Sequence, residues 1–390
     1  MTASKPFSRR EFLLTAAAAS LASASSSQET RRIKVGVIGC GSVSGSYLPI
    51  MASSRYVELV SACDIIVARA ERRAKQFNIP HVYPNIDKML DGPPFELLVN
   101  LTSMPSHYPV NSKGLEAGLN VWSEKPLAVR SEDARRLLRL SQQKKAGLWG
   151  APITVLSPQF KFMAETLQSG KLGKVTAAHA HYGHEGTLWS AWFFQPGGGS
   201  LYDLGVYNVT TLTGVLGPAK AVVGMTSICT PTRKLAGVDG LDQPEGTEVK
   251  VEVADNEMLI MDHGNGALSH VQSGYNYGSA EGHSGKSDQH TIDFWGTDGD
   301  MHLCGYDWAP HGVDLATLKE PGKRYVEDPA GYTWQNGGGY IAECLATGKR
   351  SLVTAEHALH VLEIMEACHE SQRTGRRIPV QSTFRWPLFS

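Results

Sequence analysis

The chain has 390 residues, of which 42% are hydrophobic and 19% charged, a composition typical of a soluble globular protein long enough for two domains. Its 37 Lys and Arg residues are balanced by 38 Asp and Glu residues, so no excess positive charge exists to neutralise a nucleic-acid backbone. This balance excludes a nucleic-acid partner. The six cysteines include no C-x-x-C pair and predict neither a zinc site nor a redox dithiol.

The N-terminal segment predicts export. Arg9 and Arg10 precede an apolar run at residues 12–22, and Ala22-Ser23-Ala24 is typical of a cleavage site. The run is far shorter than the roughly 20 residues that span a bilayer, so no membrane span is expected. We therefore predict a twin-arginine signal peptide over residues 1–28 and a periplasmic mature protein. A disordered Ala/Ser-rich tail is the alternative interpretation.

Residues 33–64 predict a βαβ unit. An apolar strand, Ile33–Ile38, leads into a glycine turn and a short helix, and a second strand, Val57–Cys63, follows. The first glycine of such a turn permits a tight bend, the second admits a pyrophosphate, and the helix N-terminus supplies free N–H groups. We therefore expect the turn to bind a dinucleotide. Its residues are Gly39, Cys40, Gly41, Ser42 and Val43.

Asp64 follows the second strand directly. Its carboxylate would accept hydrogen bonds from the ribose hydroxyls and repel a 2′-phosphate, which favours NAD over NADP. Arg69, Arg72 and Arg73 keep NADP open. The alternative is an aspartate that merely caps the next helix.

Two more strands are predicted at residues 97–101 and 120–122, with a helix at 108–117 between them. They complete a doubly wound parallel Rossmann sheet over residues 31–150, whose ligand crevice lies at the carboxyl ends of the strands. The residues expected to reach the cofactor there are Thr102, His107, Glu124 and Lys125.

Lys125 is the strongest catalytic candidate in this part of the chain. A partly desolvated ammonium beside a cofactor can polarise a hydroxyl or carbonyl and exchange a proton as hydride moves. A solvated surface lysine is the alternative.

Residues 151–390 have a different pattern, in which apolar and polar residues alternate. This predicts an α+β domain with a large open, mostly antiparallel sheet, ending in a helix at 355–372. Strands are expected at 174–182, 219–228, 248–261, 267–275 and 290–295, and loops at 231–245 and 278–288.

The segment before the glycines at 197–199 is rich in aromatic and histidine residues. His184, Trp189 and Trp192 are expected to bind substrate, because aromatic faces suit sugar rings. His179 and His181 share one face of a predicted strand, so a metal site is one interpretation. No acid or cysteine stands nearby at ligand spacing, and half-buried strand histidines without a metal are the favoured interpretation.

From residue 32 to about 385 the chain resembles the Gfo/Idh/MocA oxidoreductases, the group that includes glucose-fructose oxidoreductase and inositol dehydrogenase. The resemblance lies in the glycine turn, the 102–107 turn, Glu124-Lys125-Pro126 and the stretch 197–207. It implies a catalytic Lys125, presented by a Pro126 that a cis bond often precedes. It also implies assembly through the open face of the second sheet, as a homodimer or homotetramer.

The same resemblance places Asp203 and Tyr207 across the pocket from Lys125. We expect Lys125 and Tyr207 to form a proton relay, with Asp203 orienting the substrate hydroxyl or tuning the lysine. Asn208 is a further substrate candidate, or else a cap or neutral surface residue. Many relatives have His at position 207, and the Asn or Arg that many carry in segment 150–155 is absent, which puts the usual polyol contacts in doubt.

These features predict an NAD(P)-dependent oxidoreductase that acts on a carbinol carbon of a sugar or polyol, with tightly bound nicotinamide. A glycosidase or lyase that oxidises its sugar transiently is the alternative. A non-catalytic sugar-binding protein is disfavoured, because the positions of Lys125, Asp203 and Tyr207 are all filled.

Overall fold

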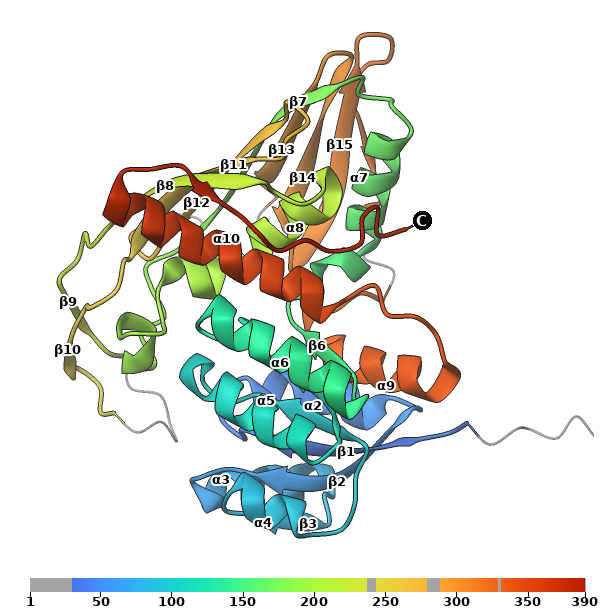
Figure 1. Cartoon of the computed structure of the whole chain (residues 1–390), viewed down its shortest axis with the longest axis vertical. Helices are drawn as coiled ribbons and strands as arrows, with labels where there is room; N and C mark the ends of the chain where they lie inside the picture. Colours follow the sequence, from blue (N-terminus) through green and yellow to red (C-terminus); the bar gives the residue numbers. More distant parts are fainter. Residues whose placement is uncertain (1–29, 237–242, 279–287, 329–330, 390) are drawn as a thin grey trace, which may run out of the picture. The chain divides into compact units, whose positions relative to one another are not determined.

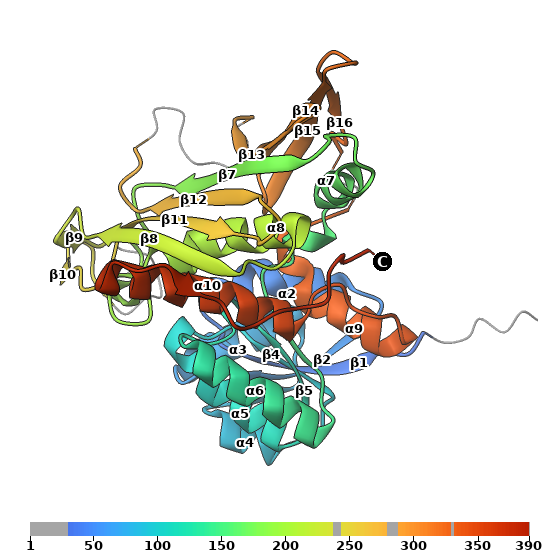
Figure 2. The ribbon, with the colours of Figure 1, turned by 45° about the horizontal axis from the view of Figure 1, so that its top comes forward.

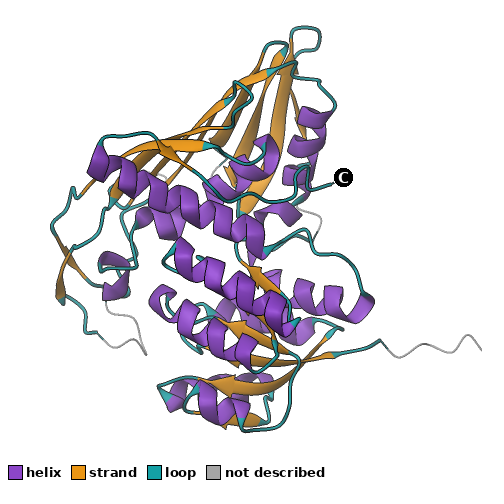
Figure 3. Ribbon diagram, viewed as in Figure 1, coloured by secondary structure: helices purple, strands orange, loops and turns teal. Residues whose placement is uncertain are grey.

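A computed structural model describes residues 30–236, 243–278, 288–328 and 331–389. The predicted signal peptide at 1–28 lies outside the described residues. Arg32–Ser390 forms one compact unit, whose described part contains a first sheet of six strands and a second sheet of nine (Figure 1; Figure 3). Among the described residues, none of the helices combines the length and hydropathy needed to cross a bilayer.

The first sheet is parallel throughout, with strand order β3-β2-β1-β4-β5-β6, which confirms the doubly wound prediction. Its central strand β4 is buried at every position, as expected where helices cover both faces. The strands are β1 Ile33–Ile38, β2 Val57–Cys63, β3 His81–Tyr83, β4 Leu97–Asn100, β5 Asn120–Ser123 and β6 Leu148–Gly150. The helices are α2 Ser44–Ser53, α3 Val67–Phe77, α4 Ile86–Leu90, η1 Met104–Ser106, α5 His107–Glu116 and α6 Ser131–Lys144.

The second sheet is mixed and mostly antiparallel, with order β16-β15-β14-β13-β7-β12-β11-β8-β17 and a parallel β7–β12 pair. The strand predicted at 248–261 is broken, because the chain turns at Asp255, whose carboxylate accepts the N–H groups of Cys229 and Thr230. The loop predicted at 231–245 contains a strand, β9, that pairs with β10. The strands of the second sheet are β7 Val175–Gly183, β8 Ala221–Ser227, β11 Asn256–Asp262, β12 Leu268–Gly274, β13 His290–Gly296, β14 Gly299–Tyr306, β15 Ala309–Thr317, β16 Lys323–Tyr325 and β17 Ile378–Pro379. A separate two-stranded sheet consists of β9 Thr232–Lys234 and β10 Glu248–Lys250.

Helices α7, α8 and α10 pack on one face of the second sheet (Figure 2). Every residue of α8 is buried, and α10 begins at a Thr354 cap whose hydroxyl accepts the His357 N–H. The helical elements of this part are η2 Thr154–Leu156, α7 Pro158–Gln168, η3 Ala191–Phe194, η4 Leu201–Gly205, α8 Val206–Leu216, η5 Trp334–Asn336, α9 Gly337–Thr347 and α10 Ala355–Thr374. The opposite face, which we call the open face, carries exposed apolar side chains of the strands: Val223, Met225, Met258, Ile260, Leu268 and Trp295.

Helix α9 returns to the first sheet, although it follows the second sheet in the chain (Figure 1). It contacts β1, β2 and β5. A Cβ atom at Gly337 would lie 2.0 Å from the Trp122 ring, and one at Gly338 would lie 2.7 Å from the Met51 sulfur. The glycines therefore let this helix approach the sheet more closely than any other residue could.

Candidate active site

The glycine turn after β1 has the backbone that a pyrophosphate needs. Gly39 has φ +90°, and a Cβ there would lie 2.5 Å from the Leu101 carbonyl carbon, so glycine is required. A Cβ at Gly41 would meet no protein atom within 4 Å, which leaves that side of the turn open to a ligand. Helix α2 begins at Ser44 without a side-chain cap, so its N-terminal N–H groups can receive an anion. Cys40, Ser42 and Val43 complete the turn.

Asp64, at the end of β2, ties this turn to the next strand. Its Oδ2 accepts the Cys40 N–H at 2.7 Å and its Oδ1 accepts the Ile66 N–H at 2.8 Å. Each oxygen keeps further lone-pair capacity, which ribose hydroxyls can use. Arg73 lies across the turn, donating from Nε to Ser44 Oγ at 3.0 Å and from Nη2 to Gly41 O at 3.3 Å. The residues present therefore fit a dinucleotide, with the Asp64 carboxylate placed to disfavour a 2′-phosphate.

Lys125 follows β5 at the same carboxyl edge of the first sheet, with β4 between β5 and β1. The Lys125–Pro126 peptide bond is cis, as the resemblance implied. Glu124 Oε2 accepts the Lys125 N–H at 2.9 Å, while Glu124 Oε1 accepts a short hydrogen bond from the buried Tyr47 hydroxyl. Tyr47 therefore fixes Glu124, and Glu124 fixes the backbone that presents the lysine.

Lys125, Asp203 and Tyr207 lie together. Lys125 Nζ donates to Asp203 Oδ1 and to Asp203 O, both at 2.6 Å, and each side chain is only 11% exposed. The same ammonium lies 5.1 Å from the centroid of the Tyr207 ring. Asp203 belongs to the π-helical turn η4 and Tyr207 to the first turn of α8, so one continuous segment presents both to the lysine.

Tyrosines surround this cluster. Tyr275, which directly follows β12, donates its hydroxyl to Asp203 Oδ2 at 3.0 Å. The ring of Tyr182 lies 6.3 Å from that of Tyr207. Burial, with Glu124 nearby, raises the pKa of Tyr207 well above its usual range, so its phenol holds its proton at neutral pH. The cluster thus combines a fixed ammonium with a neutral phenol.

The other predicted cofactor residues lie at the same edge of the sheet. Thr102 donates from N and Oγ1 to Asn100 Oδ1. The ring nitrogens of His107 lie 2.6 Å from Pro126 O and 2.9 Å from Thr102 O, and burial lowers the pKa of this histidine. At 1% exposure, His107 joins the two turns, and its ring is already occupied by their carbonyls.

The predicted substrate residues divide into two groups. His184 lies 5.7 Å, ring to ring, from Tyr275, and Asn208 donates to Asp307 Oδ2 at 3.2 Å, on the turn between β14 and β15. Trp189, two residues before η3, is 40% exposed, and Trp192, within η3, stacks on Phe193 with ring centroids 3.7 Å apart. The structure thus brings His184 to Tyr275, which bonds Asp203, and bonds the Asn208 amide to Asp307. Both tryptophan rings contact Phe193, and Trp192 also packs against the core.

Tyr47, Tyr275 and Asp307 were not identified as site residues from the sequence. Tyr275 closes the predicted strand 267–275, and an aromatic hydroxyl at a strand end was the available signal. Tyr47 bonds Glu124, which lies 77 residues later in the chain, and Asp307 bonds Asn208, which lies about 100 residues earlier. No local sequence pattern connects residues so far apart.

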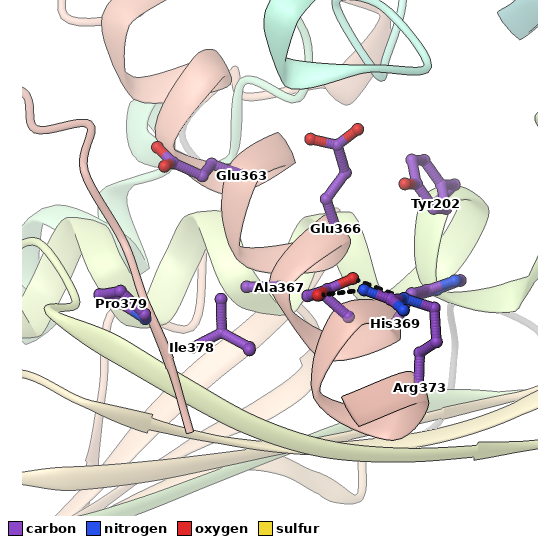
Figure 4. A pocket seen from close by; sticks show the side chains of 9 residues that line it. Tyr202, Glu363, Glu366, Ala367, His369, Arg373, Ile378 and Pro379 are labelled. Atoms are coloured by element: carbon purple, nitrogen blue, oxygen red, sulfur yellow. Dashed lines mark hydrogen bonds and ion pairs between the residues drawn. The ribbon is translucent and has the colours of Figure 1, made fainter. Parts of the chain in front are cut away.

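A separate hollow of about 510 Å³ lies along the C-terminal half of α10 (Figure 4). Its carboxylates already have partners within the protein: Glu370 pairs with Arg373, Glu363 with Arg135, and Glu366 accepts the Ser131 N–H. It is lined by Tyr202, Glu363, Glu366, Ala367, His369, Glu370, Arg373, Ile378 and Pro379. The lining includes none of the Lys125 cluster.

Comparison with known proteins decides the family. Residues 33–150 match the oxidoreductase family described as having an NAD-binding Rossmann fold, and residues 160–302 match the GFO/IDH/MocA C-terminal domain. The chain belongs to the Gfo/Idh/MocA family. This membership confirms the resemblance seen in the sequence and makes NAD the cofactor of its Rossmann domain.

Among curated proteins, this Gfo/Idh/MocA chain is similar to trans-1,2-dihydrobenzene-1,2-diol dehydrogenase. Identity is 28% over 193 residues with the Mus musculus protein and 30% over 190 residues with the Oryctolagus cuniculus protein. These matches cover 48% and 47% of this chain and, in both cases, 57% of the relative. The chain thus aligns with little more than half the length of these curated relatives.

Solved structures share the fold across almost the whole chain. Levoglucosan dehydrogenase, in complex with NADH and levoglucosan, has a TM-score of 0.76 at 17% identity, covering 90% of this chain and 100% of that one. Aldose-aldose oxidoreductase from Caulobacter crescentus has a TM-score of 0.73 at 20% identity, with the same coverage. At such identity the likeness shows that the Gfo/Idh/MocA architecture is retained.

Proposed function

We propose that the protein is an NAD-dependent oxidoreductase that transfers hydride to or from a carbinol carbon of a sugar or related polyol. The observation that carries the proposal is the buried Lys125–Asp203 pair with Tyr207 beside it, at the sheet edge that also holds the glycine turn. The sugar class is supported by two structural neighbours, one solved with levoglucosan and one named as an aldose-aldose oxidoreductase.

Each site residue has a separate role in the proposed reaction. Gly39, Gly41 and Asp64 hold the dinucleotide, which supplies the hydride acceptor or donor when bound. Lys125 directs its ammonium at the substrate oxygen and stabilises negative charge that develops there. Asp203 holds that ammonium in place through a 2.6 Å contact, so the lysine does not have to reorganise during the reaction.

Tyr207 moves the proton. Its raised pKa keeps the phenol protonated at neutral pH, so it has a proton to give to the oxygen of a carbonyl substrate as hydride arrives at the adjacent carbon. Proton donation leaves a phenolate beside the Lys125 ammonium, whose positive charge favours that anion. In the oxidising direction Tyr207 has to lose its proton before it can accept the one from the substrate hydroxyl. Lys125 and Tyr207 together form the proton relay.

Export would add a constraint on the cofactor. We propose that Arg9 and Arg10 direct the protein through the twin-arginine route to the periplasm, where free nicotinamide nucleotide is scarce. Such a protein keeps its NAD bound and regenerates it in place by coupling oxidation of one substrate to reduction of another. Replacing both arginines with lysine should leave the protein in the cytoplasmic fraction, whereas the unchanged leader should deliver it to the periplasmic fraction.

Two measurements test the function. Denaturing the purified protein should release about one nicotinamide nucleotide per chain, and a screen of carbohydrates should change the absorbance of the bound cofactor. Lys125→Met and Tyr207→Phe should each abolish turnover of any substrate found, whereas Lys113→Met, at a surface lysine paired with Asp87, should not. Unchanged turnover in Lys125→Met and Tyr207→Phe would refute the assignment of these residues to catalysis. A protein that binds NAD only at millimolar concentration would refute the proposal that it keeps its NAD bound.

The same screen separates the alternative reaction class. A glycosidase or lyase that oxidises its sugar transiently returns the hydride and shows no net redox change. Aryl glycosides should therefore remain intact with this protein. Release of the aglycone without net redox change would replace the oxidoreductase proposal with the hydrolytic one. Lys125, Asp203 and Tyr207 would then serve the transient hydride step.

A further inference from the structure

Histidines and aspartates form a row across the open face of the second sheet. His270 on β12 lies opposite His179 on β7, which lies opposite Asp293 on β13. Asp293 in turn lies opposite His302 on β14, which lies opposite Asp314 on β15. Asp293 is therefore the acid beside His179 that the local sequence pattern did not show, because it belongs to a strand more than 100 residues later in the chain.

Asp293 lies at the centre of a group of metal-ligand atoms. Its Oδ1 is 2.6 Å from His302 Nδ1, and its Oδ2 is 3.7 Å from His179 Nδ1. His290 stacks on His302, with ring centroids 4.7 Å apart and planes 6° from parallel. Ligand atoms of His290, Asp293 and His302 all lie within 4.8 Å of one another, so small side-chain rotations would bring them to the ~2.0–2.2 Å of zinc coordination.

Each imidazole also has an outer carboxylate. His302 Nε2 lies 2.9 Å from Asp300 Oδ1, and His290 Nε2 lies 2.9 Å from Asp314 Oδ2. Metal-binding histidines almost always donate their second ring N–H to a carboxylate, carbonyl or water, which fixes the ring and leaves the other nitrogen for the ion. Both histidines of this group have such a carboxylate partner. Surface histidines that do not bind a metal have no need of one.

The local charge favours a cation. Four carboxylates, those of Asp288, Asp293, Asp300 and Asp314, stand near the group, and Arg324 is the cation that pairs with two of them. An ion would therefore enter a region with an excess of negative charge.

A second group, His290 with Cys304 and Asp314, is a poorer ligand set. Burial and the Asp314 carboxylate raise the pKa of the Cys304 thiol to about 12, so the thiolate that zinc binds does not form readily. Both oxygens of Asp314 already accept from Arg324, at 2.8 and 2.9 Å.

We propose that His290, Asp293 and His302 form a binding site for a divalent transition-metal ion of the zinc class, with Asp300 and Asp314 orienting the two imidazoles. The ion would join β13 to β14 on the open face, on residues that do not overlap the Lys125 cluster. The site does not depend on the proposed oxidoreductase function.

A proton is the competing occupant of this group. Hydrogen bonds to Asp293 and Asp300 raise the pKa of His302, and an imidazolium would satisfy the same two carboxylates. Metal binding has to displace that proton. A direct binding measurement therefore distinguishes an ion site from a protonated cluster.

The test is a titration of the full-length, chelator-treated protein with Zn²⁺ by calorimetry and with Co²⁺ by visible absorbance. We expect one ion per chain, a cobalt spectrum of low coordination number, and at least about tenfold weaker binding in His302→Gln and in His290→Gln. Asp300→Asn, which removes only an orienting carboxylate, should weaken binding by about tenfold. His270→Gln is the matched control on the same face and should bind as the unchanged protein does.

Two outcomes would overturn the site. One is the absence of saturable binding up to about millimolar Zn²⁺, which would leave the group as a protonated network. The other is an equal loss in His270→Gln, which would place the ion on the His179–His270 pair, whose rings stack at 5.0 Å. Thermal unfolding of each variant without metal is the folding control: a variant that unfolds at the same temperature as the unchanged protein has lost binding and not folding.

Discussion

Gly39 and Gly41 stand two residues apart in the turn after β1, yet a methyl group at each has a different consequence. A Cβ at Gly39 would lie 2.5 Å from the Leu101 backbone at a φ of +90°, whereas one at Gly41 would meet no protein atom within 4 Å. The first glycine therefore serves the fold of the turn. The second leaves room for a ligand that approaches the turn from outside.

This difference predicts separable effects on stability and binding. Gly41→Ala should unfold within about 0.5 kcal/mol of the unchanged protein but bind NAD at least about tenfold more weakly, because the new methyl occupies the approach of the pyrophosphate. Gly39→Ala should be destabilised by at least about 1 kcal/mol. Urea unfolding and NAD calorimetry measure the two quantities. A Gly41→Ala protein with unchanged NAD affinity would place the dinucleotide elsewhere.

Tyr275 tests how much the orientation of Asp203 contributes. Its hydroxyl donates to Asp203 Oδ2 at 3.0 Å, on the side of the carboxylate away from Lys125. We expect Tyr275→Phe to lower kcat/KM by about tenfold, the cost of one hydrogen bond to a charged group, and Asp203→Asn to lower it by at least about 100-fold. NAD affinity should change in neither variant.

Tyr340→Phe is the matched control for Tyr275→Phe. It also loses a hydrogen bond, to the Leu352 N–H in another part of the chain, so it should reduce stability but leave kcat/KM unchanged. Equal activity losses in the two Tyr→Phe variants would mean that Tyr275 acts through stability alone.

At the scale of elements, the π-helical turn η4 is the segment that positions Asp203, and a buried carboxyl holds its start. Ser200, which precedes η4, donates a short hydrogen bond to Glu257 Oε2 on β11, and Ser273 on β12 donates to Ser200 O at 2.8 Å. Glu257 is 1% exposed, and burial raises its pKa to about 8. The second sheet thus fixes the catalytic segment through a carboxyl that is protonated at neutral pH.

Glu257 predicts a pH dependence of stability. Between pH 4.5 and about 8 the folded protein holds a proton that the unfolded chain has lost, so the free energy of unfolding should fall as pH rises across this window. The fall contributed by Glu257 is at most about 1.4 kcal/mol per pH unit. Glu257→Gln keeps a neutral hydrogen-bonding group and should lose this contribution, becoming more stable than the unchanged protein near pH 8.

The measurement is urea unfolding of both proteins from pH 5 to 8.5. Glu165→Gln, at an exposed carboxylate beside Lys161, is the control and should retain the original slope. Parallel profiles for Glu257→Gln and the unchanged protein would show that Glu257 does not carry a shifted proton.

Whether an element was predicted from the sequence depended on how local its pattern is. The strands Ile33–Ile38 and Val57–Cys63 were predicted at their observed bounds, because apolar runs bounded by turn residues identify them without reference to the rest of the chain. The strand at 248–261 was predicted as one piece, because alternation continues through Asp255 and gives no sign of the contacts that turn the chain there. Glu257, Tyr275 and Asp293 acquire their roles from strand register, which composition and spacing do not contain.

At the scale of the whole molecule, the open face of the second sheet carries apolar side chains that nothing covers in the described structure. Its apolar part pairs Val223 with Ile260 and Met225 with Met258 across β8 and β11, and these side chains are 42–73% exposed. A second copy of the chain would cover such a patch by two-fold symmetry. The proposed homodimer or homotetramer rests on this face.

Charged substitutions on this face should separate the subunits. Met225→Glu combined with Ile260→Glu should produce a monomer with an unchanged circular dichroism spectrum, because both side chains point away from the core. Light scattering after size exclusion measures the mass. Leu318→Glu, at an 84% exposed apolar residue outside β8 and β11, is the control and should remain oligomeric. A monomeric unchanged protein at micromolar concentration would contradict the assembly.

Helix α9 has a consequence for the order in which the molecule forms. The strands of the first sheet are complete by residue 150, but the close packing of Gly337 on Trp122 and of Gly338 on Met51 waits for a segment made nearly 200 residues later. During synthesis, the emerging Rossmann sheet therefore leaves one of its packing surfaces uncovered until most of the second sheet has left the ribosome. The first domain to be translated is among the last to be finished.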